Sequence, residues 1–340
     1  MATTTGLPRT HTMPANRVLV TVTHIHDREA PYLQRLEAEG LEVVRRIGKQ
    51  GKLTEDELIQ TLPGAFATLA GSEPYTERVF QSAPGLRVVS RWGVGFDAID
   101  LAAATRHGVA VCTAAGANHE AVADYAFALM GALQRGLVHN HRLITRGVWR
   151  TDFRPGLSRA TVGIVGLGRI GQAVARRCRG FDMRILAYEP NPDFVFVRAH
   201  WIEIVSLEDL LRQSDLVTLH CPGGSDTRHL INRERLRLMK PTAHLVNTAR
   251  GSLVDEAALC EALTSGWIAG AGLDVFEREP LTDSPLFELD NVLLSPHVAG
   301  VDYASEVAMA NRAIDSILAV RRGQAPPSDC LLNPEALAPR

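Results

Sequence analysis

The sequence has few cysteines, and no two of them form a C-x-x-C pair. Its 340 residues include five cysteines, an odd number scattered along the chain: Cys112, Cys178, Cys221, Cys260 and Cys330. This spacing argues against a disulfide framework and against a zinc site. We therefore expect no metal centre. We expect the thiols to be small buried or half-buried side chains in a reducing compartment, which makes the cytoplasm the expected location.

Long hydrophobic runs and an excess of one charge are also absent. No apolar stretch approaches the roughly 20 residues that span a bilayer, and residues 1–16 lack the apolar block of a secretory signal. We expect those first residues to be a loose tail. The 36 basic and 38 acidic residues give a formal net charge of −2. Such a chain has no general attraction to nucleic acid or to an anionic membrane, so we expect neither as a partner.

The remaining composition is that of an ordinary globular protein. Hydrophobic residues make up 46% of the chain and charged residues 22%, which excludes wholesale disorder, collagen and coiled coil. At roughly 150 residues per domain, the length predicts about two domains.

Two series of alternating apolar and amphipathic segments follow one another along the chain. In the first series, the expected strands are 18–22, 42–46, 67–70, 88–89 and 109–111, with helices at 31–39 and 55–62. In the second, they are 161–165, 184–188, 216–219, 243–246, 268–271 and 292–294, with helices at 169–179 and 306–321. This alternation predicts an α/β protein with two doubly wound parallel-sheet domains. Segment 120–133 is apolar around much of its circumference, so we expect a helix buried in a large domain or against a partner subunit.

A glycine-rich turn follows the first strand of the second series. Gly166 suits a tight turn, Gly168 the close approach of a pyrophosphate, and Gly171 a close helix–strand contact. Three glycines alone also serve ordinary turns, but here they join a strand to an amphipathic helix whose N-terminus favours phosphates. Glu189 ends the next strand, 18 residues after Gly171. A carboxylate there fits ribose hydroxyls and repels a 2′-phosphate, which favours NAD over NADP.

Polar residues also follow four later strands of the second series, in segments 220–222, 247–251, 274–280 and 295–300. Ligands of open α/β sheets bind at the carboxyl ends of the strands. Arg250, Glu279 and His297 therefore form a plausible reaction constellation. Taken singly, each also has an ordinary explanation as a surface cation, a solvated carboxylate or a loop histidine.

These motifs, taken in order, resemble the D-isomer-specific 2-hydroxyacid dehydrogenase family. The matching segments are GLGRIG, HCP, NTARG, LDVFEREP and SPHVAG, with RWGVGFDAID at 91–100 upstream. The resemblance runs from about residue 16 to residue 333, which is nearly the whole chain. It implies hydride transfer between NAD(H) and C2 of a D-2-hydroxy acid or 2-oxo acid.

The resemblance also implies roles for single residues. Arg250 corresponds to the arginine that binds the substrate carboxylate and polarises the neighbouring carbonyl. His297 corresponds to the general acid–base, and Glu279 to the carboxylate that holds it and favours its protonated form. Backbone N–H groups of Val94 and Gly95 would bind the substrate carboxylate. The positions implied for the cofactor are Val94, Gly166, Gly168, Arg169, Ile170, Gly171, Glu189, His220, Cys221, Thr248, Ala249, Asp274 and Gly300.

In that family the chain starts in one domain, crosses to the other and returns. The resemblance thus implies a flavodoxin-like substrate lobe at 17–116 with 301–323, and a Rossmann NAD-binding lobe at 117–300. Residues 324–340 would form a C-terminal tail. Segment 120–133 resembles the dimer-forming helix of the family, which implies a homodimer through the nucleotide domain.

Two kinds of substrate are compatible with the sequence. Segments 69–75 and 116–123 resemble the phosphoglycerate-dehydrogenase-like branch, and Ser72 lies in the expected substrate loop. Enzymes acting on phosphoglycerate usually present a cation near this loop, whereas this sequence offers the acidic Glu73. Both 3-phosphoglycerate and a smaller acid such as glyoxylate or hydroxypyruvate are candidates. An alternative of another class is an NAD-dependent binding protein of the corepressor type, with little or no turnover.

Overall fold

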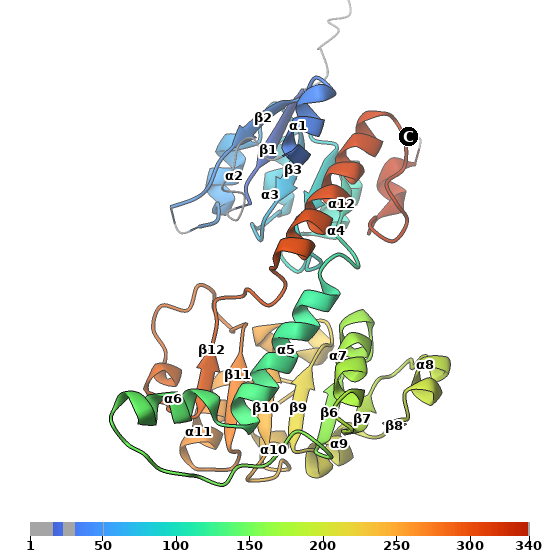
Figure 1. Cartoon of the computed structure of the whole chain (residues 1–340). Helices are drawn as coiled ribbons and strands as arrows, with labels where there is room; N and C mark the ends of the chain where they lie inside the picture. The colour runs from blue at the N-terminus through green and yellow to red at the C-terminus, as the bar shows by residue number, and fades with distance from the viewer. Residues whose placement is uncertain (1–15, 23–30, 50, 339–340) are drawn as a thin grey trace, which may run out of the picture. The chain divides into compact units, whose positions relative to one another are not determined.

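The computed structural model describes residues 16–22, 31–49 and 51–338, which fall into two compact units (Figure 1). Unit 1 comprises residues 1–117 with 306–340, and unit 2 comprises residues 118–305. The expected N-terminal tail lies outside the described residues except for Asn16, whose carbonyl accepts a hydrogen bond of 2.8 Å from the N–H of Glu42.

Unit 1 is built on a five-stranded parallel sheet in the order β2-β1-β3-β4-β5. This is the flavodoxin-like strand order, in which the chain winds outward in both directions from its first strand. The strands are short and mostly buried on both faces: β1 (Arg17–Val20), β2 (Glu42–Arg45), β3 (Ala65–Ala70), β4 (Val88–Arg91) and β5 (Ala110–Cys112).

Helices cover both faces of this sheet. One apolar core packs α1 and α12 against the sheet, and a second core packs α2, α3 and α4 against the other face. The helices are α1 (Pro31–Ala38), α2 (Glu55–Thr61), α3 (Glu77–Ser82), α4 (Leu101–Arg106) and α12 (Tyr303–Arg321). The last helix therefore begins three residues earlier than the apolar pattern suggested.

The segment after α12 is packed, although the sequence suggested only a polar tail. Cys330 is fully buried, and the N–H of Leu332 donates to the carbonyl of Val111 at 2.9 Å. The side chain of Asn333 accepts from the N–H of Val111 at 2.7 Å and donates to the carbonyl of Val109 at 3.0 Å. These bonds satisfy backbone groups at the free edge of β5 and fix the segment in place.

Unit 2 is built on a seven-stranded parallel sheet in the order β12-β11-β10-β9-β6-β7-β8. This is the Rossmann strand order extended by one strand. The strands are β6 (Thr161–Val165), β7 (Arg184–Tyr188), β8 (Ile202–Ile204), β9 (Leu216–Leu219), β10 (His244–Asn247), β11 (Gly270–Leu273) and β12 (Val292–Leu294). Strand β8 was not among the expected strands, because it is an edge strand in which only Ile202 is buried. Together the two sheets confirm the expected α/β fold class.

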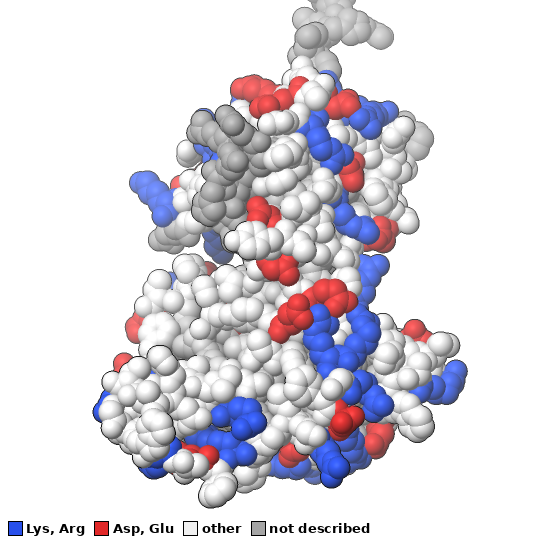
Figure 2. All heavy atoms as spheres, viewed as in Figure 1, with Lys and Arg blue, Asp and Glu red and all other residues white. Residues whose placement is uncertain are grey.

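The helices of unit 2 also lie on both faces of its sheet. One core contains residues of α5 and α7, and the other contains residues of α9, α10 and α11. The helices are α5 (His119–Gln134), α6 (Leu137–Thr145), α7 (Arg169–Arg179), α8 (Phe194–Ala199), α9 (Leu207–Gln213), α10 (Arg233–Leu236) and α11 (Glu256–Thr264). Acidic and basic side chains gather where α5 lies beside α7 (Figure 2), with ion pairs Arg176–Glu120 and Arg177–Asp124.

The strongly apolar helix α5 has eight buried residues, and five of them belong to a core of unit 2. It packs against α7 and against strands β10 and β11. Of the two explanations for its apolar pattern, burial inside a large domain therefore accounts for much of it. The following helix, α6, is different because none of its residues is buried.

Candidate active site

The carboxyl ends of the strands in unit 2 bring together most of the residues that the sequence singled out. Strands β6 and β9 are neighbours in the sheet, although other elements separate them in the chain. The strand order reverses between them, and such a switch point leaves a crevice for a ligand. Gly166 follows β6 and His220 follows β9, so both lie at this point.

The three glycines meet different demands. Gly166 has φ +93°, and a Cβ there would lie 2.7 Å from the backbone nitrogen of Cys221. A Cβ on Gly171 would lie 2.1 Å from the carbonyl oxygen of Gly166, so both positions exclude any side chain. A Cβ on Gly168 would meet nothing within 4 Å. The open space therefore lies at Gly168, the N-cap of α7, where a helix terminus can receive a phosphate.

Glu189 lies against the glycine-rich loop. Its Oε2 accepts a hydrogen bond from the N–H of Leu167 at 2.8 Å, and its Oε1 accepts one from the N–H of Asn191 at 3.0 Å. The side chain is half-buried. The carboxylate thus fixes the glycine-rich loop at Leu167 and lies next to the open space at Gly168.

Buried polar atoms without partners also mark this crevice. Among the described residues, neither Oγ1 of Thr248 nor Nδ1 of His220 has a hydrogen-bond partner. The other ring nitrogen of His220 lies 2.9 Å from Oγ1 of Thr218, and burial lowers the pKa of His220 to about 3. Burial raises the pKa of the Cys221 thiol to about 11. Neutral groups with unsatisfied donors and acceptors, next to an open helix N-terminus, fit a dinucleotide such as NAD.

The other residues expected at the cofactor lie in the same loops. Arg169 and Ile170 form the first turn of α7. The N–H of Ala249 donates to Oδ1 of Asn247 at 3.1 Å. A Cβ on Gly300 would lie 2.6 Å from Nδ2 of Asn118, so this glycine is in close contact with the start of α5.

Arg250, Glu279 and His297 follow β10, β11 and β12, which are neighbouring strands. Nδ1 of His297 lies 2.8 Å from Oε2 of Glu279, and the His297 side chain is half exposed. Oε1 of Glu279 accepts from the N–H of Phe276 at 3.0 Å. Burial raises the pKa of Glu279, but the hydrogen bond and charge of His297, the Phe276 N–H and the charge of Arg250 outweigh it. The pKa of Glu279 therefore lies below its usual range, and the group is a carboxylate at neutral pH.

Asp274 holds the loop that carries His297. It is fully buried; its Oδ1 accepts from Oγ of Ser295 at 2.6 Å and from the N–H of Val298 at 2.9 Å, and its Oδ2 accepts from the N–H of Ala299 at 2.8 Å. His297 has φ +57°, a conformation that residues other than glycine keep only when their surroundings enforce it. The resemblance of the motifs implies a place for Asp274 at the cofactor, and no local pattern in the sequence indicates these bonds.

Asn247 has a similar effect on the loop that carries Arg250. Its Nδ2 donates to the carbonyl of Arg250 at 2.8 Å, and Nη1 of Arg250 donates to the carbonyl of Ala249 at 2.6 Å. The sequence reading did not single out Asn247. Its position at the end of an otherwise apolar strand was the available signal.

The remaining expected residues belong to unit 1. Ser72 follows β3, and Val94 and Gly95 follow β4, which is the neighbouring strand in the sheet. Ser72 is exposed, whereas Val94 and Gly95 are half-buried. The two loops therefore leave adjacent strands at the carboxyl edge of the unit 1 sheet. Glu73, next to Ser72, is 1% exposed, and burial raises its pKa.

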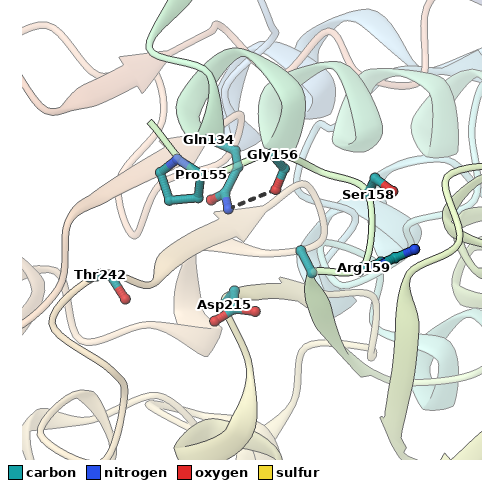
Figure 3. Close-up of a pocket in the computed structure, with 8 residues that line it drawn as sticks. Gln134, Pro155, Gly156, Ser158, Arg159, Asp215 and Thr242 are labelled. Atoms are coloured by element: carbon teal, nitrogen blue, oxygen red, sulfur yellow. Dashed lines mark hydrogen bonds between the residues drawn. The ribbon is translucent and has the colours of Figure 1, made fainter. Parts of the chain in front are cut away.

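A different pocket lies at the opposite, amino edge of the unit 2 sheet (Figure 3). Its lining includes Ala160, Asp215 and Thr242, which precede β6, β9 and β10, and Nε2 of Gln134 donates to the carbonyl of Gly156 at 3.3 Å. This pocket is separate from the site above.

Among the described residues, no group of three His, Cys, Asp or Glu side chains could hold a metal ion. No helix in this part of the chain is long and apolar enough to cross a membrane.

Comparison with known proteins agrees with this geometry. The family model "D-isomer specific 2-hydroxyacid dehydrogenase, NAD binding domain" matches residues 127–299. A glyoxylate reductase from Korarchaeum cryptofilum is 45% identical over 276 residues, which cover 79% of this chain and 82% of that relative. A glyoxylate reductase from Pyrococcus horikoshii is 44% identical over 275 residues, 78% of this chain and 82% of that relative.

A solved structure of similar fold is the TT0316 protein from Thermus thermophilus, which is 38% identical. It covers 92% of this chain and 98% of its own, with a TM-score of 0.83. With an NAD-binding model over half of the chain and relatives at this identity, the resemblance of the motifs is confirmed. The chain belongs to the D-isomer specific 2-hydroxyacid dehydrogenase family, and it is an NAD-dependent oxidoreductase that transfers a hydride to or from 2-oxo and 2-hydroxy acids.

Proposed function

We propose that this enzyme reduces glyoxylate or a similarly small 2-oxo acid, and that Arg250, Glu279 and His297 carry the reaction. The observation that carries the proposal is the 2.8 Å contact between His297 and Glu279, close enough to Arg250 for its charge to lower the pKa of Glu279. These are the groups that proton transfer and carboxylate binding require, and they stand at the carboxyl edge of the unit 2 sheet.

In this mechanism, bound NADH supplies the hydride. The forked guanidinium of Arg250 grips the substrate carboxylate and polarises the adjacent carbonyl. Because Nδ1 of His297 is engaged by Glu279, the other ring nitrogen, Nε2, gives a proton to the carbonyl oxygen during reduction. In oxidation, a neutral His297 takes the hydroxyl proton at the same atom. Glu279 orients the ring through its hydrogen bond with Nδ1.

We propose that unit 2 is the NAD-binding lobe and unit 1 the substrate-binding lobe, with Ser72, Val94 and Gly95 at the substrate. The open space at Gly168 and the unpartnered Thr248 Oγ1 support the first assignment. The adjacent loops after β3 and β4 support the second, because backbone N–H groups at strand ends can bind a carboxylate.

The buried Glu73 favours a small acid over a phosphorylated one. It lies directly beside Ser72 in the expected substrate loop and is 1% exposed. In place of the cation that usually faces a phosphorylated substrate, this loop carries an acidic residue, and relatives 45% and 44% identical are named glyoxylate reductases. The resemblance of segments 69–75 and 116–123 to the phosphoglycerate-dehydrogenase-like branch makes 3-phosphoglycerate the second candidate.

We further propose that two copies of the chain associate through unit 2, in a cytoplasmic homodimer. No residue of α6 is buried, and the segment after it exposes large apolar side chains. The exposed fractions are 92% for Trp149 and 101% for Phe153. Such an exposed apolar surface is unfavourable in water, and a second copy of the chain would cover it.

The scattered cysteines suit a reducing compartment, which supports the cytoplasmic location.

The direct test is a substrate panel with the purified chain. We expect NADH-dependent reduction of glyoxylate or hydroxypyruvate, weaker reduction of 3-phosphohydroxypyruvate, and a loss of at least about tenfold in kcat/KM for Arg250→Ala. NAD binding without turnover of any 2-oxo acid would instead favour a binding protein of the corepressor type. Faster turnover of the phosphorylated substrate would overturn the role given to Glu73.

A further inference from the structure

Two side chains that the mechanism above does not use, those of Glu256 and His229, contact the segment that carries Glu279. Oε1 of Glu256 accepts a hydrogen bond from the backbone N–H of Glu277. Nε2 of His229 lies 2.5 Å from Oε1 of the same Glu277. Glu277 is therefore bound both through its main chain and through its side chain. It lies two positions before Glu279, the carboxylate that contacts His297.

The holding residues are themselves fixed to the loop that carries Arg250. The N–H of His229 donates to the carbonyl of Ser252 at 2.8 Å, and the N–H of Ile231 donates to that of Leu253 at 2.8 Å. Glu256 begins α11, whose N-cap is Asp255. The segments 229–231, 250–256 and 276–279 therefore form one hydrogen-bonded group at the carboxyl edge of the unit 2 sheet.

Close packing leaves this group little freedom to move. A Cβ on Gly251 would lie 1.9 Å from the carbonyl carbon of Phe276 and 2.4 Å from the backbone nitrogen of Glu277. The main chain directly after Arg250 thus touches the main chain two to three residues before Glu279. A shift of the 276–279 segment would change the spacing of both groups.

The charges show that the arrangement is maintained against repulsion. Burial raises the pKa of Glu256, and so do the charges of Glu277 and Glu279, against the lowering effect of the Glu277 N–H. On its own helix, Glu256 faces the thiol of Cys260. Three carboxyl groups remain close together because each has a hydrogen-bond partner: the Glu277 N–H for Glu256, His229 for Glu277, and His297 with the Phe276 N–H for Glu279.

We infer that Glu256 is a positioning residue for the Glu279–His297 pair, holding the 276–279 segment through the N–H of Glu277 while His229 holds the Glu277 side chain. This rests on the proposed acid–base role of the pair. Without the hydrogen bond between Glu256 and the N–H of Glu277, repulsion among the three carboxylates moves the 276–279 segment away from Glu256. Glu279 then loses its alignment with Nδ1 of His297. Small misplacements of this kind reduce the rate of the chemical step more than they reduce binding.

The test compares Glu256→Ala, which removes the acceptor, with Glu256→Gln, which keeps an acceptor oxygen and removes only the charge. Asp255 caps α11 independently, so neither change removes the helix cap. The matched control is Glu261→Ala, because Glu261 lies on the same helix and pairs with Arg233 on the surface. For each variant, kcat and KM for 2-oxo acid and for NADH, and the pH profile of reduction, are measured beside thermal unfolding.

We expect Glu256→Ala to lower kcat about tenfold with little change in KM for NADH. Its pH profile of reduction should differ from that of the wild type, because a misaligned Glu279 no longer holds the ring of His297. Glu256→Gln should retain most of the activity, and Glu261→Ala should retain nearly all of it.

Two further variants separate the inference from the proposed function. If Glu279→Gln moves the pH profile while Glu256→Ala leaves kcat and the profile unchanged, the positioning role is overturned and the acid–base pair stands. If His297→Ala remains active, the acid–base role is overturned, and the inference about Glu256 falls with it. Equal loss in Glu256→Gln and Glu256→Ala would show that the charge, rather than the hydrogen bond, is what matters, and would also overturn the inference.

Discussion

Several residues of the site owe their geometry to neighbours that perform no chemistry themselves. His297 keeps a left-handed backbone conformation because Asp274 accepts hydrogen bonds from the main chain on its C-terminal side. The carboxylate of Asp274 also accepts a third hydrogen bond, from Oγ of Ser295, so this buried group fixes the loop rigidly. Replacing Asp274 should therefore lower the stability of the protein as well as its activity.

We predict that Asp274→Asn destabilises the protein by about 1–3 kcal/mol, because an amide NH₂ group replaces one of the oxygens that now accept from protein donors. Denaturant unfolding of both proteins measures this difference. Asp290→Asn is the control, since Asp290 is mostly exposed and pairs with Arg142 on the surface. An Asp274→Asn protein as stable as the wild type would show that the hydrogen bonds at Asp274 are dispensable.

The preference for NAD should depend on Glu189. We predict that the enzyme prefers NADH by at least about tenfold in kcat/KM, which corresponds to about 1.4 kcal/mol. Glu189→Gln keeps an acceptor for the N–H of Leu167 but removes the charge, so it should narrow this preference. Adding Pro190→Arg should narrow it further, because an arginine can accommodate the 2′-phosphate. Equal rates with both cofactors in the unmodified enzyme would refute the role of Glu189.

At the scale of helices and strands, unit 1 depends on contacts between neighbouring elements that are not adjacent in the sequence. Glu77, at the start of α3, accepts from Arg106 and lies 2.7 Å from Nε2 of His107, both at the end of α4. The hydrogen bond with His107, and then the one from Arg106, lower the pKa of Glu77 to about 2. This carboxylate therefore joins the two short helices.

We predict that Glu77→Gln lowers the melting temperature at neutral pH. Because the folded-state pKa is depressed, the stabilisation is fully present above the ordinary glutamate value of 4.5 and is lost as the pH falls towards 2. The difference in melting temperature between wild type and variant should shrink over that range. Glu37→Gln, an exposed change on α1, is the control. If the difference in melting temperature stayed the same at low pH, the contact of Glu77 with Arg106 and His107 would not be ionic.

At the scale of the whole molecule, each unit has its own parallel sheet with a core on both faces. Large apolar side chains on α6 and in the segment that follows it remain exposed. Leu137 and Ile144 on α6 are exposed, as are Trp149 and Phe153 beyond it. This surface is the best candidate for contact with a second copy.

We predict that the wild-type chain has a molar mass in solution of twice 37.0 kDa. Trp149→Ser combined with Phe153→Ser should shift it towards the monomer, because the pair removes the most exposed aromatic surface of this region. Light scattering coupled to size-exclusion chromatography measures the mass. Trp201→Ser is the control, since Trp201 is also highly exposed but lies in the turn between α8 and β8. A wild-type monomer would refute the proposed dimer.

Much of the fold was predictable from the sequence. The expected bounds of β6, α7, β7, β9 and β12 are those of the structure, because each is a strongly periodic or fully apolar segment between clear turn signals. The glycine spacing and the polar residues at strand ends predicted where a ligand site should form. A parallel sheet always brings the carboxyl ends of its strands to one edge, so local patterns were sufficient to indicate this edge.

Other features depended on contacts that no local pattern encodes. Edge strand β8 and helix α6 were missed because neither has a buried face of its own. The packing of residues 324–338 became visible only when Asn333 was placed against β5. The expectation that segment 120–133 forms a buried helix was correct, but only the structure showed that α5 packs against β10 and β11.

The sequence by itself determined the fold class, the family and the candidate reacting groups, because periodicity, glycine spacing and ordered motifs are all local. Only the tertiary structure decided how those groups are held. Asp274 is 23 residues from His297, and Glu256 is 21 residues from Glu277. Whether such side chains reach one another depends on which strands are neighbours and on how each loop turns back. These are properties of the assembled sheet, since the order of its strands decides which loops lie side by side.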